Sequence, residues 1–254
     1  MARPKKAKQR HEPESIAHTL DEIESTGDRI TEWALENPRI ILGAGAAILV
    51  VAAGVALVQA RAESNREEAS AALGAVQTEY RLAMGASPDD VIIPEPANPE
   101  TARRVREDFV QRFEEVATTH PGTAGGAIAG LEAGDLEEAL DQPDEAVATW
   151  EQTAAQIGPS SPLSALLQLR MAAVHEAAGR WIEAGEAFER AADVESFPLR
   201  YTARAEAARC YAEGGEDARA LEAYDRVKRD DPNAFLPEHV ESRMAELRIA
   251  QHLN

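Results

Sequence analysis

The sequence has few aromatic residues and few strand-forming runs. Aromatic side chains supply only 5% of the 254 residues, whereas alanine, glutamate, leucine and arginine recur throughout the chain. Residues that favour strands are therefore scarce, and residues that favour helices are abundant. The composition predicts an all-α protein, and an apolar content of 44% is sufficient for a buried core.

Cysteine is almost absent, because Cys210 is the only one. An intramolecular disulfide is excluded. Cys210 lies in an alanine-rich stretch with Ala205, Ala207 and Ala208, and we expect no group that would lower the pKa of its thiol. We therefore expect a small buried apolar residue and not a reactive nucleophile.

Positive charge is also in short supply. The chain carries 26 Lys and Arg against 45 Asp and Glu, for a net charge of -19. Nucleic-acid binding needs clustered cations that face phosphates, so no nucleic-acid partner is expected.

Motifs that carry chemistry are missing as well. The six histidines are dispersed, without an HExxH or a paired metal-ligand spacing, and no GxSxG elbow or Walker loop occurs. Carboxylate pairs such as Glu114-Glu115 and Glu137-Glu138 are typical of solvated helix faces. The sequence predicts a protein that is not an enzyme, with no catalytic residues, no metal site and no cofactor. The histidines are His11, His18, His120, His175, His239 and His252.

One long apolar run, from Ile40 to Val58, contains no charged or strongly polar side chain. Nineteen helical residues cover about 28 Å, close to the thickness of a bilayer's hydrocarbon core. We predict a transmembrane helix over 40–58, in preference to a buried core helix, which would show a polar side. A cleaved signal peptide is a weaker alternative, although Ala60-Arg61-Ala62 has the form of a cleavage site.

Positive charge is distributed unequally around this run. Counting positive charges predicts a cytoplasmic N-terminus and a C-terminal domain across the membrane, which would be the periplasmic side of a bacterial inner membrane. Seven Lys and Arg precede the run, at Arg3, Lys5, Lys6, Lys8, Arg10, Arg29 and Arg39, against Arg61 and Arg66 in the fifteen residues after it.

Residues 1–39 divide into a basic tail and an amphipathic acidic helix from Pro13 to Asn37. Trp33 near the span suits an interfacial anchor. A helix that rests on the membrane and a dedicated cytoplasmic docking peptide remain equal alternatives.

A helical repeat follows residue 100. Pairs of an alanine and an aromatic residue four positions apart recur at intervals of 38 and 36 residues, and a proline follows each aromatic after eight to ten residues. In a helix hairpin the small residue lets two helices approach, the aromatic fills the space between them, and the proline ends the second helix. The predicted repeat core is Phe113, Ala146, Trp150, Ala184, Phe188, Ala220 and Tyr224.

These residues resemble the tetratricopeptide repeat. The resemblance implies a helical-hairpin solenoid over residues 61–254, which follows the predicted transmembrane helix. The predicted units are 64–121, 122–159, 160–198 and 199–233, with a terminal helix at about 237–252. The first unit departs from the pattern because Phe109 replaces the expected alanine, and the aromatic usual in each first helix is missing.

The first unit also contains a proline-rich segment, residues 86–100, around Val91, Ile92 and Ile93. Its four prolines favour an extended path. It is interpreted as a loop that covers the end of the solenoid, with a partner-docking segment as the alternative.

The first helices of such a solenoid line its concave surface, so they hold the candidate partner groove. Its residues are mostly apolar or acidic, and only one is basic, which disfavours a clamp for a peptide's terminal carboxylate. Non-native, basic or amphipathic segments fit better. The predicted groove is Ile128, Leu131, Asp135, Leu169, Ala173, Glu176, Arg209 and Glu213.

The whole layout is similar to the ancillary subunit family of the SecYEG translocon. The residues that carry this resemblance are the helix end Glu36-Asn37-Pro38-Arg39, the single span, a helix start near Glu63-Ser64 and the divergent repeats. The resemblance implies a chaperone-like, protein-binding role with translocon subunits and exported clients as partners. The alternative is a scaffold of another inner-membrane complex for division, motility or secretion. The oligomeric state is left open.

Overall fold

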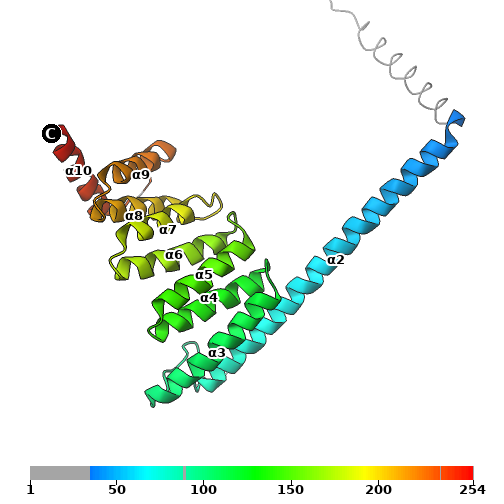
Figure 1. The fold of residues 1–254 in the computed structure, drawn as a ribbon, viewed down its shortest axis with the longest axis horizontal. Helices are drawn as coiled ribbons and strands as arrows, with labels where there is room; N and C mark the ends of the chain where they lie inside the picture. Colours follow the sequence, from blue (N-terminus) through cyan, green and yellow to red (C-terminus); the bar gives the residue numbers. More distant parts are fainter. Residues whose placement is uncertain (1–34, 88–89, 235, 254) are drawn as a thin grey trace, which may run out of the picture. The chain divides into compact units, whose positions relative to one another are not determined.

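The computed structural model describes residues 35–87, 90–234 and 236–253, and every regular element in these residues is a helix (Figure 1). The all-α prediction is therefore confirmed. The helices are α2 (Pro38–Ala83), α3 (Pro99–Thr119), α4 (Ala124–Ala139), α5 (Pro143–Ile157), α6 (Pro162–Ala177), α7 (Trp181–Ala192), α8 (Arg200–Glu213), α9 (Asp217–Asp230) and α10 (Glu238–Leu253).

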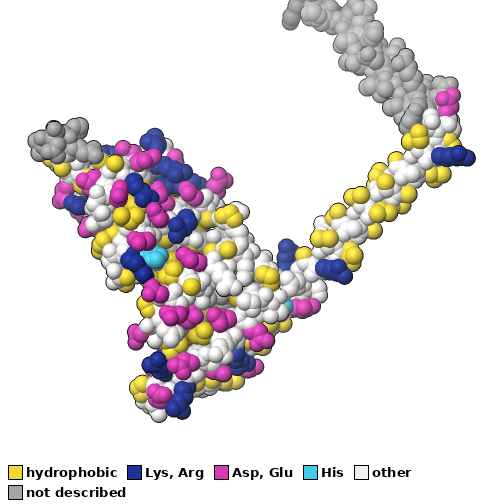
Figure 2. Space-filling view, viewed as in Figure 1, with side chains coloured by type: hydrophobic (Ala, Val, Ile, Leu, Met, Phe, Trp, Pro, Cys, Tyr) yellow, Lys and Arg dark blue, Asp and Glu magenta, His cyan; other side chains and the backbone are white. Residues whose placement is uncertain are grey.

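The chain divides into two compact units, residues 1–61 and residues 62–254. In the first unit, α2 contains the predicted span 40–58 and is long and apolar enough to cross a membrane by length and composition. No part of that apolar window is buried, and Figure 2 shows hydrophobic side chains along it without charged ones. The basic tail and nearly all of the predicted helix Pro13–Asn37 lie outside the described residues.

The helix expected to start near Glu63-Ser64 does not begin there. α2 extends from Pro38 to Ala83, so the same helix includes the apolar stretch and the first packed residues of the second unit. The prediction of a separate helix was wrong because Ala60, Ala62 and the Glu and Arg residues around them are good helix formers, and no glycine or proline interrupts them.

The second unit is a row of helix hairpins. Residues 62–83 of α2 pack with α3, and then α4 with α5, α6 with α7 and α8 with α9, with α10 at the end (Figure 1). The turns inside the last three hairpins each place one residue in the left-handed backbone region: Asp141, Gly179 and Gly215, with φ of 62°, 69° and 79°. In the sequence, these turns correspond to the turn-favouring runs Asp141-Gln142-Pro143, Gly179-Arg180 and Gly214-Gly215.

Side-chain caps and prolines fix where several helices begin. Asn98 accepts a hydrogen bond from the Glu100 amide, and Pro99 supplies the first helical residue of α3. Thr123 caps α4 through the Gly126 amide at 3.0 Å. The prolines that punctuate the sequence thus start helices as well as follow them, because a first-turn residue needs no amide donor.

The core of the first hairpin is aromatic. Tyr80 of α2 packs against Phe109 of α3 with ring centroids 5.3 Å apart, and Phe113 completes the cluster at 6.2 Å from Tyr80. Phe109 therefore fills the space opposite Tyr80, which explains why no alanine is needed there. The expectation that first helices lack aromatics holds for α4 and α6, but Tyr80 of α2 and both Tyr201 and Tyr211 of α8 are exceptions.

The predicted repeat-core residues lie inside the hairpins. Phe113, Ala146, Trp150, Ala184 and Ala220 are fully buried, and Tyr224 is 7% exposed. Phe188 is half-buried and packs against three neighbouring clusters, so it joins successive hairpins.

Glycine in α4 permits a close helix contact. A Cβ atom at Gly134 would lie 2.1 Å from Nε1 of Trp150, and a Cβ at Gly130 would lie 2.1 Å from Oγ1 of Thr153. No real side chain fits at those distances. The α4–α5 contact therefore depends on the absence of side chains from one stripe of α4.

The buried guanidinium of Arg204 links the third hairpin to the fourth. Arg204 of α8 is 1% exposed and donates to Asp193 at 2.9 Å and to Asp230 at 3.1 Å. Both carboxylates remain partly exposed to solvent. The guanidinium thus has charged partners on both sides, which is the condition for burying an arginine.

The proline-rich segment is held at several points. Ile93 packs against the core of the first hairpin, Arg106 pairs with Glu95 at 2.6 Å, and the Ser87 amide donates to the Asp90 carboxylate at 2.6 Å. Val91 and Ile92 between these contacts are 94% and 81% exposed. Its described residues, 86–87 and 90–98, contain no helix, and α3 begins at Pro99.

Candidate protein-binding face

All eight residues of the predicted groove lie on α4, α6 and α8, which are the first helices of the second, third and fourth hairpins. We call the side of these three helices that carries the eight residues the first-helix face. Three apolar residues of this face are only partly exposed, and each also packs against a buried core cluster: Ile128, Leu131 and Leu169. Ala173 and Glu213 are exposed. Asp135, Glu176 and Arg209 are half-buried and charged.

Ion pairs connect one first helix to the next across this face. Asp135 of α4 and Arg170 of α6 are joined at 3.1 Å, and the Nη2 atom of Arg170 also donates to Oδ2 at 3.2 Å. Glu176 of α6 accepts from Arg209 of α8 at 2.8 Å. Successive repeats are thus linked by opposite charges at their first helices.

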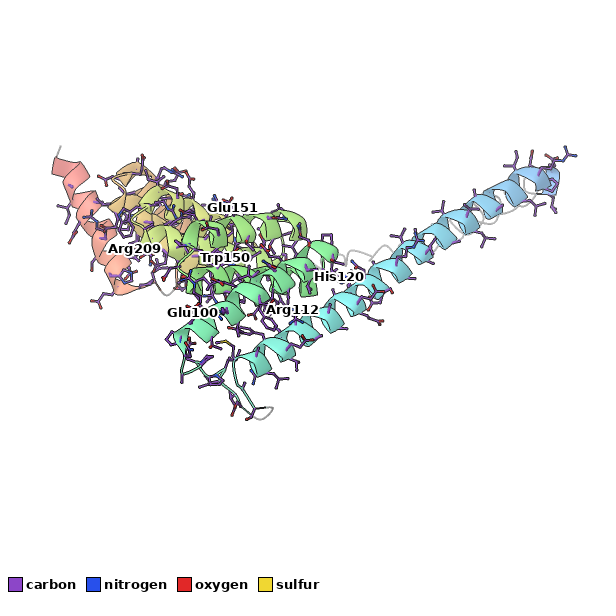
Figure 3. All side chains as sticks on the ribbon, turned by 60° about the horizontal axis from the view of Figure 1, so that its bottom comes forward. Glu100, Arg112, His120, Trp150, Glu151 and Arg209 are labelled. Carbon is purple, nitrogen blue, oxygen red and sulfur yellow. The ribbon has the colours of Figure 1, made fainter. Side chains whose placement is uncertain are left out.

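The same pattern continues to the terminal helix. Arg209 also donates to Glu206 at 2.7 Å, and Arg243 of α10 lies 3.8 Å from Glu213. His239 of α10 is 3.6 Å from Glu206. Arg209, labelled in Figure 3, therefore lies between two carboxylates and carries no uncompensated charge.

The arginines of this face are already paired with carboxylates of the protein itself. Arg170, Arg209 and Arg243 each contact a carboxylate, and Arg209 and Arg243 each contact two. A peptide's terminal carboxylate would have to displace one of these partners. The arrangement is better matched to a partner that brings positive charge and apolar surface.

Asp135 has an altered acidity. Burial raises the pKa of its carboxyl to about 6, and the Arg170 guanidinium only partly opposes the rise. Desolvation of the charged form outweighs the ion pair. The Asp135 carboxyl is therefore half ionised at about pH 6, so the Asp135–Arg170 pair is fully charged only well above that pH and weakens as the pH falls through it.

The thiol of Cys210, the residue after Arg209, is poorly placed to react. Cys210 is fully buried beside Arg209, and burial raises the pKa of the thiol to about 12. A thiol with that pKa is protonated and poorly nucleophilic at neutral pH. In the part of the chain that the structure describes, no group of three His, Cys, Asp or Glu residues could hold a metal ion.

Sequence reasoning did not find Arg170, Glu206 and Arg243, which complete the ion pairs of this face. A signal for them exists: Asp135 and Arg170 are 35 residues apart, and Glu176 and Arg209 are 33 apart. Opposite charges separated by one repeat length mark equivalent positions on consecutive first helices. The unit boundaries alone did not indicate which helix faces turn toward each other.

Stacked helix hairpins with buried cores and a charged first-helix face define a repeat protein of the tetratricopeptide class, a fold typical of protein-binding scaffolds without catalytic function. The family model for the tetratricopeptide repeat-like domain matches residues 31–248, which is most of the chain. The chain belongs to the tetratricopeptide repeat-like domain family.

Two solved structures are similar to this chain. They are crystal structures of nearly identical TPR-like repeats of a candidate kinesin light chain from Podosopora anserina, one of them a single-substitution variant. Each is 21% identical with a TM-score of 0.43, and the match covers 61% of this chain and 85% of the other. No curated protein matches the sequence.

Proposed function

We propose that this protein is a membrane-anchored, chaperone-like binding module that links the protein export translocon to exported clients. The repeat domain binds non-native, basic or amphipathic segments on its first-helix face. The apolar part of α2 holds the protein in the inner membrane, with the N-terminus in the cytoplasm and residues 61–254 in the periplasm. The fold-level part of this proposal, a protein-binding module, rests on the family.

One observation carries the client-binding part: the arginines of the first-helix face are already paired, so its surplus charge is negative. Residues 62–254 contain 37 Asp and Glu against 18 Lys and Arg, and they account for the entire net charge of -19. Leu166, 39% exposed, and Ala173 add apolar surface on α6. Acidic and apolar groups side by side attract cationic amphipathic chains and repel acidic ones.

Two other observations support the part of the proposal that concerns the membrane and the translocon. The apolar window of α2 has no protein side chains covering it, which is the condition expected of a helix that faces lipid or a membrane partner. The order of basic tail, span and repeats resembles the translocon's ancillary subunit family.

The first test targets Ala173, which is exposed in the middle of α6. Replacing Ala173 with arginine adds a bulky cation to the first-helix face without opening the core. We expect the affinity for an unfolded basic protein, such as reduced and alkylated lysozyme, to fall about five- to ten-fold, equivalent to roughly 1–1.4 kcal/mol. Fluorescence anisotropy with labelled lysozyme and the full chain in mild detergent measures it.

The matched control is Ala148→Arg, the same substitution at an exposed position of the second helix α5. It should leave the affinity unchanged. Equal losses in both variants would mean that charge alone matters, and unchanged affinity in Ala173→Arg would reject the first-helix face. Leu131 and Leu169 are poorer targets than Ala173, because both pack against core clusters.

Attachment to the translocon is tested by exchanging residues 1–60 for an unrelated span of the same orientation. Crosslinking to translocon subunits should be lost, while lysozyme binding should persist. Recovery of a stable assembly without translocon subunits from the unmodified protein would favour the scaffold of another inner-membrane complex.

The orientation predicts which residues an impermeant reagent reaches. In spheroplasts, an introduced cysteine at Glu151, an exposed position of α5, should react with an added maleimide, whereas one at Ser15 should stay protected. The native Cys210 gives no background because it is buried and protonated. Protection of the Glu151→Cys thiol together with labelling of the Ser15→Cys thiol would reverse the topology.

A further inference from the structure

A cleft lies on the opposite set of helices, between the second helices α3 and α5. It measures about 250 Å³ and is lined by Glu114, Ala117, Thr118, Thr149, Gln152, Thr153 and Gln156. That volume is below the usual range for drug-sized ligands and fits one long side chain or a small amine.

The hydroxyl groups of this cleft have their hydrogens directed away from it. Thr118 donates to the backbone oxygen of Glu114 at 2.8 Å, and Thr153 donates to that of Thr149 at 2.8 Å. The hydroxyl of Thr149 hydrogen-bonds the carboxylate of Glu137, a residue that is 7% exposed. What these three oxygens have left to offer a ligand is lone pairs, so they act as acceptors.

The charge around the cleft is negative and uncompensated. Glu114 at its rim has no ion-pair partner among the described residues, and it lies close enough to Glu137 to interact electrostatically. Burial raises the pKa of Glu137, the hydrogen bond from Thr149 opposes the rise, and the charge of Glu114 adds to it. Residues 113–169 contain ten Asp and Glu but no Lys or Arg, so no cation of this stretch can neutralise the pair.

Glu137 does not line the cleft itself, but its carboxyl interacts with two residues that do, Thr149 and Glu114. The Oε2 atom of Glu137 is buried and has no hydrogen-bond partner in the described residues. Buried carboxylate oxygens without partners are rare and costly. A donor-rich cation in the cleft would lower the electrostatic cost of both Glu114 and Glu137.

We propose that the cleft between α3 and α5 binds an arginine side chain of a partner protein, with Glu114 as its charged acceptor. A guanidinium offers five N–H donors in a planar fork, which suits one carboxylate surrounded by several hydroxyl and amide oxygens better than the three donors of an ammonium do. This site is on the second helices and is separate from the first-helix face, so it goes beyond the proposed function. Its failure would leave the Ala173 test unaffected.

The test uses the full chain in mild detergent and the tripeptide acetyl-Ala-Arg-Ala-amide, followed by NMR titration. The peptide should bind, and the analogue with neutral citrulline in place of arginine should bind at least five-fold more weakly. Glu114→Gln should weaken the arginine peptide at least five-fold. The matched control is Glu115→Gln, which removes the same charge from an exposed neighbouring residue that does not line the cleft, and it should change the affinity less than two-fold.

Three outcomes would overturn the proposal. Equal losses in Glu114→Gln and Glu115→Gln would show diffuse attraction to an acidic surface. Equal binding of the arginine and citrulline peptides would show that charge is not recognised. Agmatine that binds as tightly as the peptide would assign the cleft to a free small amine and not to a partner's side chain.

Discussion

Replacing Trp150 with alanine should lower the free energy of unfolding by about 3–5 kcal/mol. Trp150 is fully buried between α4, α5 and the third hairpin, and its Nε1 atom donates to the Leu131 backbone oxygen at 3.1 Å (Figure 3). Truncation removes the largest core side chain and leaves a cavity that rigid helices do not close. Urea unfolding of the full chain in mild detergent, followed by circular dichroism, measures the change.

The control for this experiment is Trp150→Phe, which keeps an aromatic ring but removes the N–H donor. It should cost less than the alanine variant, and the difference separates packing from the hydrogen bond, which contributes about 1 kcal/mol. A Trp150→Ala protein that unfolds at the urea concentration of the unmodified chain would contradict the position of Trp150 in the core.

A second large effect is expected at Gly134. Alanine is the better helix former by about 1 kcal/mol, yet Gly134→Ala should destabilise the protein by about 1–3 kcal/mol, because its Cβ would overlap the Trp150 ring. The overlap is at 2.1 Å from Nε1, and the ring is too tightly packed to move aside. The same urea titration measures it.

Gly74 of α2 provides a matched control, since a Cβ there would meet nothing within 4 Å and the residue is exposed. Gly74→Ala should stabilise the protein by about 0.5–1 kcal/mol. The penalty at Gly134 should also shrink in a Trp150→Ala background, because the clashing ring is gone. Equal stabilisation by both alanine substitutions would reject the close α4–α5 contact.

Two surfaces of the repeat domain differ in chemistry. On the first-helix face, arginines are present but paired, as Arg170 and Arg209 show. On the second helices, the cleft beside Glu114 has carboxylates and hydroxyl oxygens without a cation. The two proposed sites, one for an extended client and one for an arginine side chain, therefore lie on different sets of helices.

Much of the fold was predictable because its signals are local. Helices follow from propensity and spacing, and the left-handed turn residues Asp141, Gly179 and Gly215 lie where the sequence has turn signals. The helix boundary near Glu63 could not be placed, because a change from apolar to charged residues does not stop a helix. The candidate face was predicted by residue type, but three of its four apolar members, Ile128, Leu131 and Leu169, also pack against the core.

The sequence by itself determined an all-helical chain, a repeat of 36–38 residues, one apolar stretch long enough to span a bilayer and an acidic repeat domain. Those properties depend on residue type and on separations along the chain. The tertiary structure decided that Gly134 faces Trp150, that Arg209 lies between Glu176 and Glu206, and that Glu114 borders a cleft. These contacts depend on how far each helix is rotated about its axis against its neighbours. That rotation is set jointly by the packing of side chains from several helices, so no single stretch of sequence specifies it.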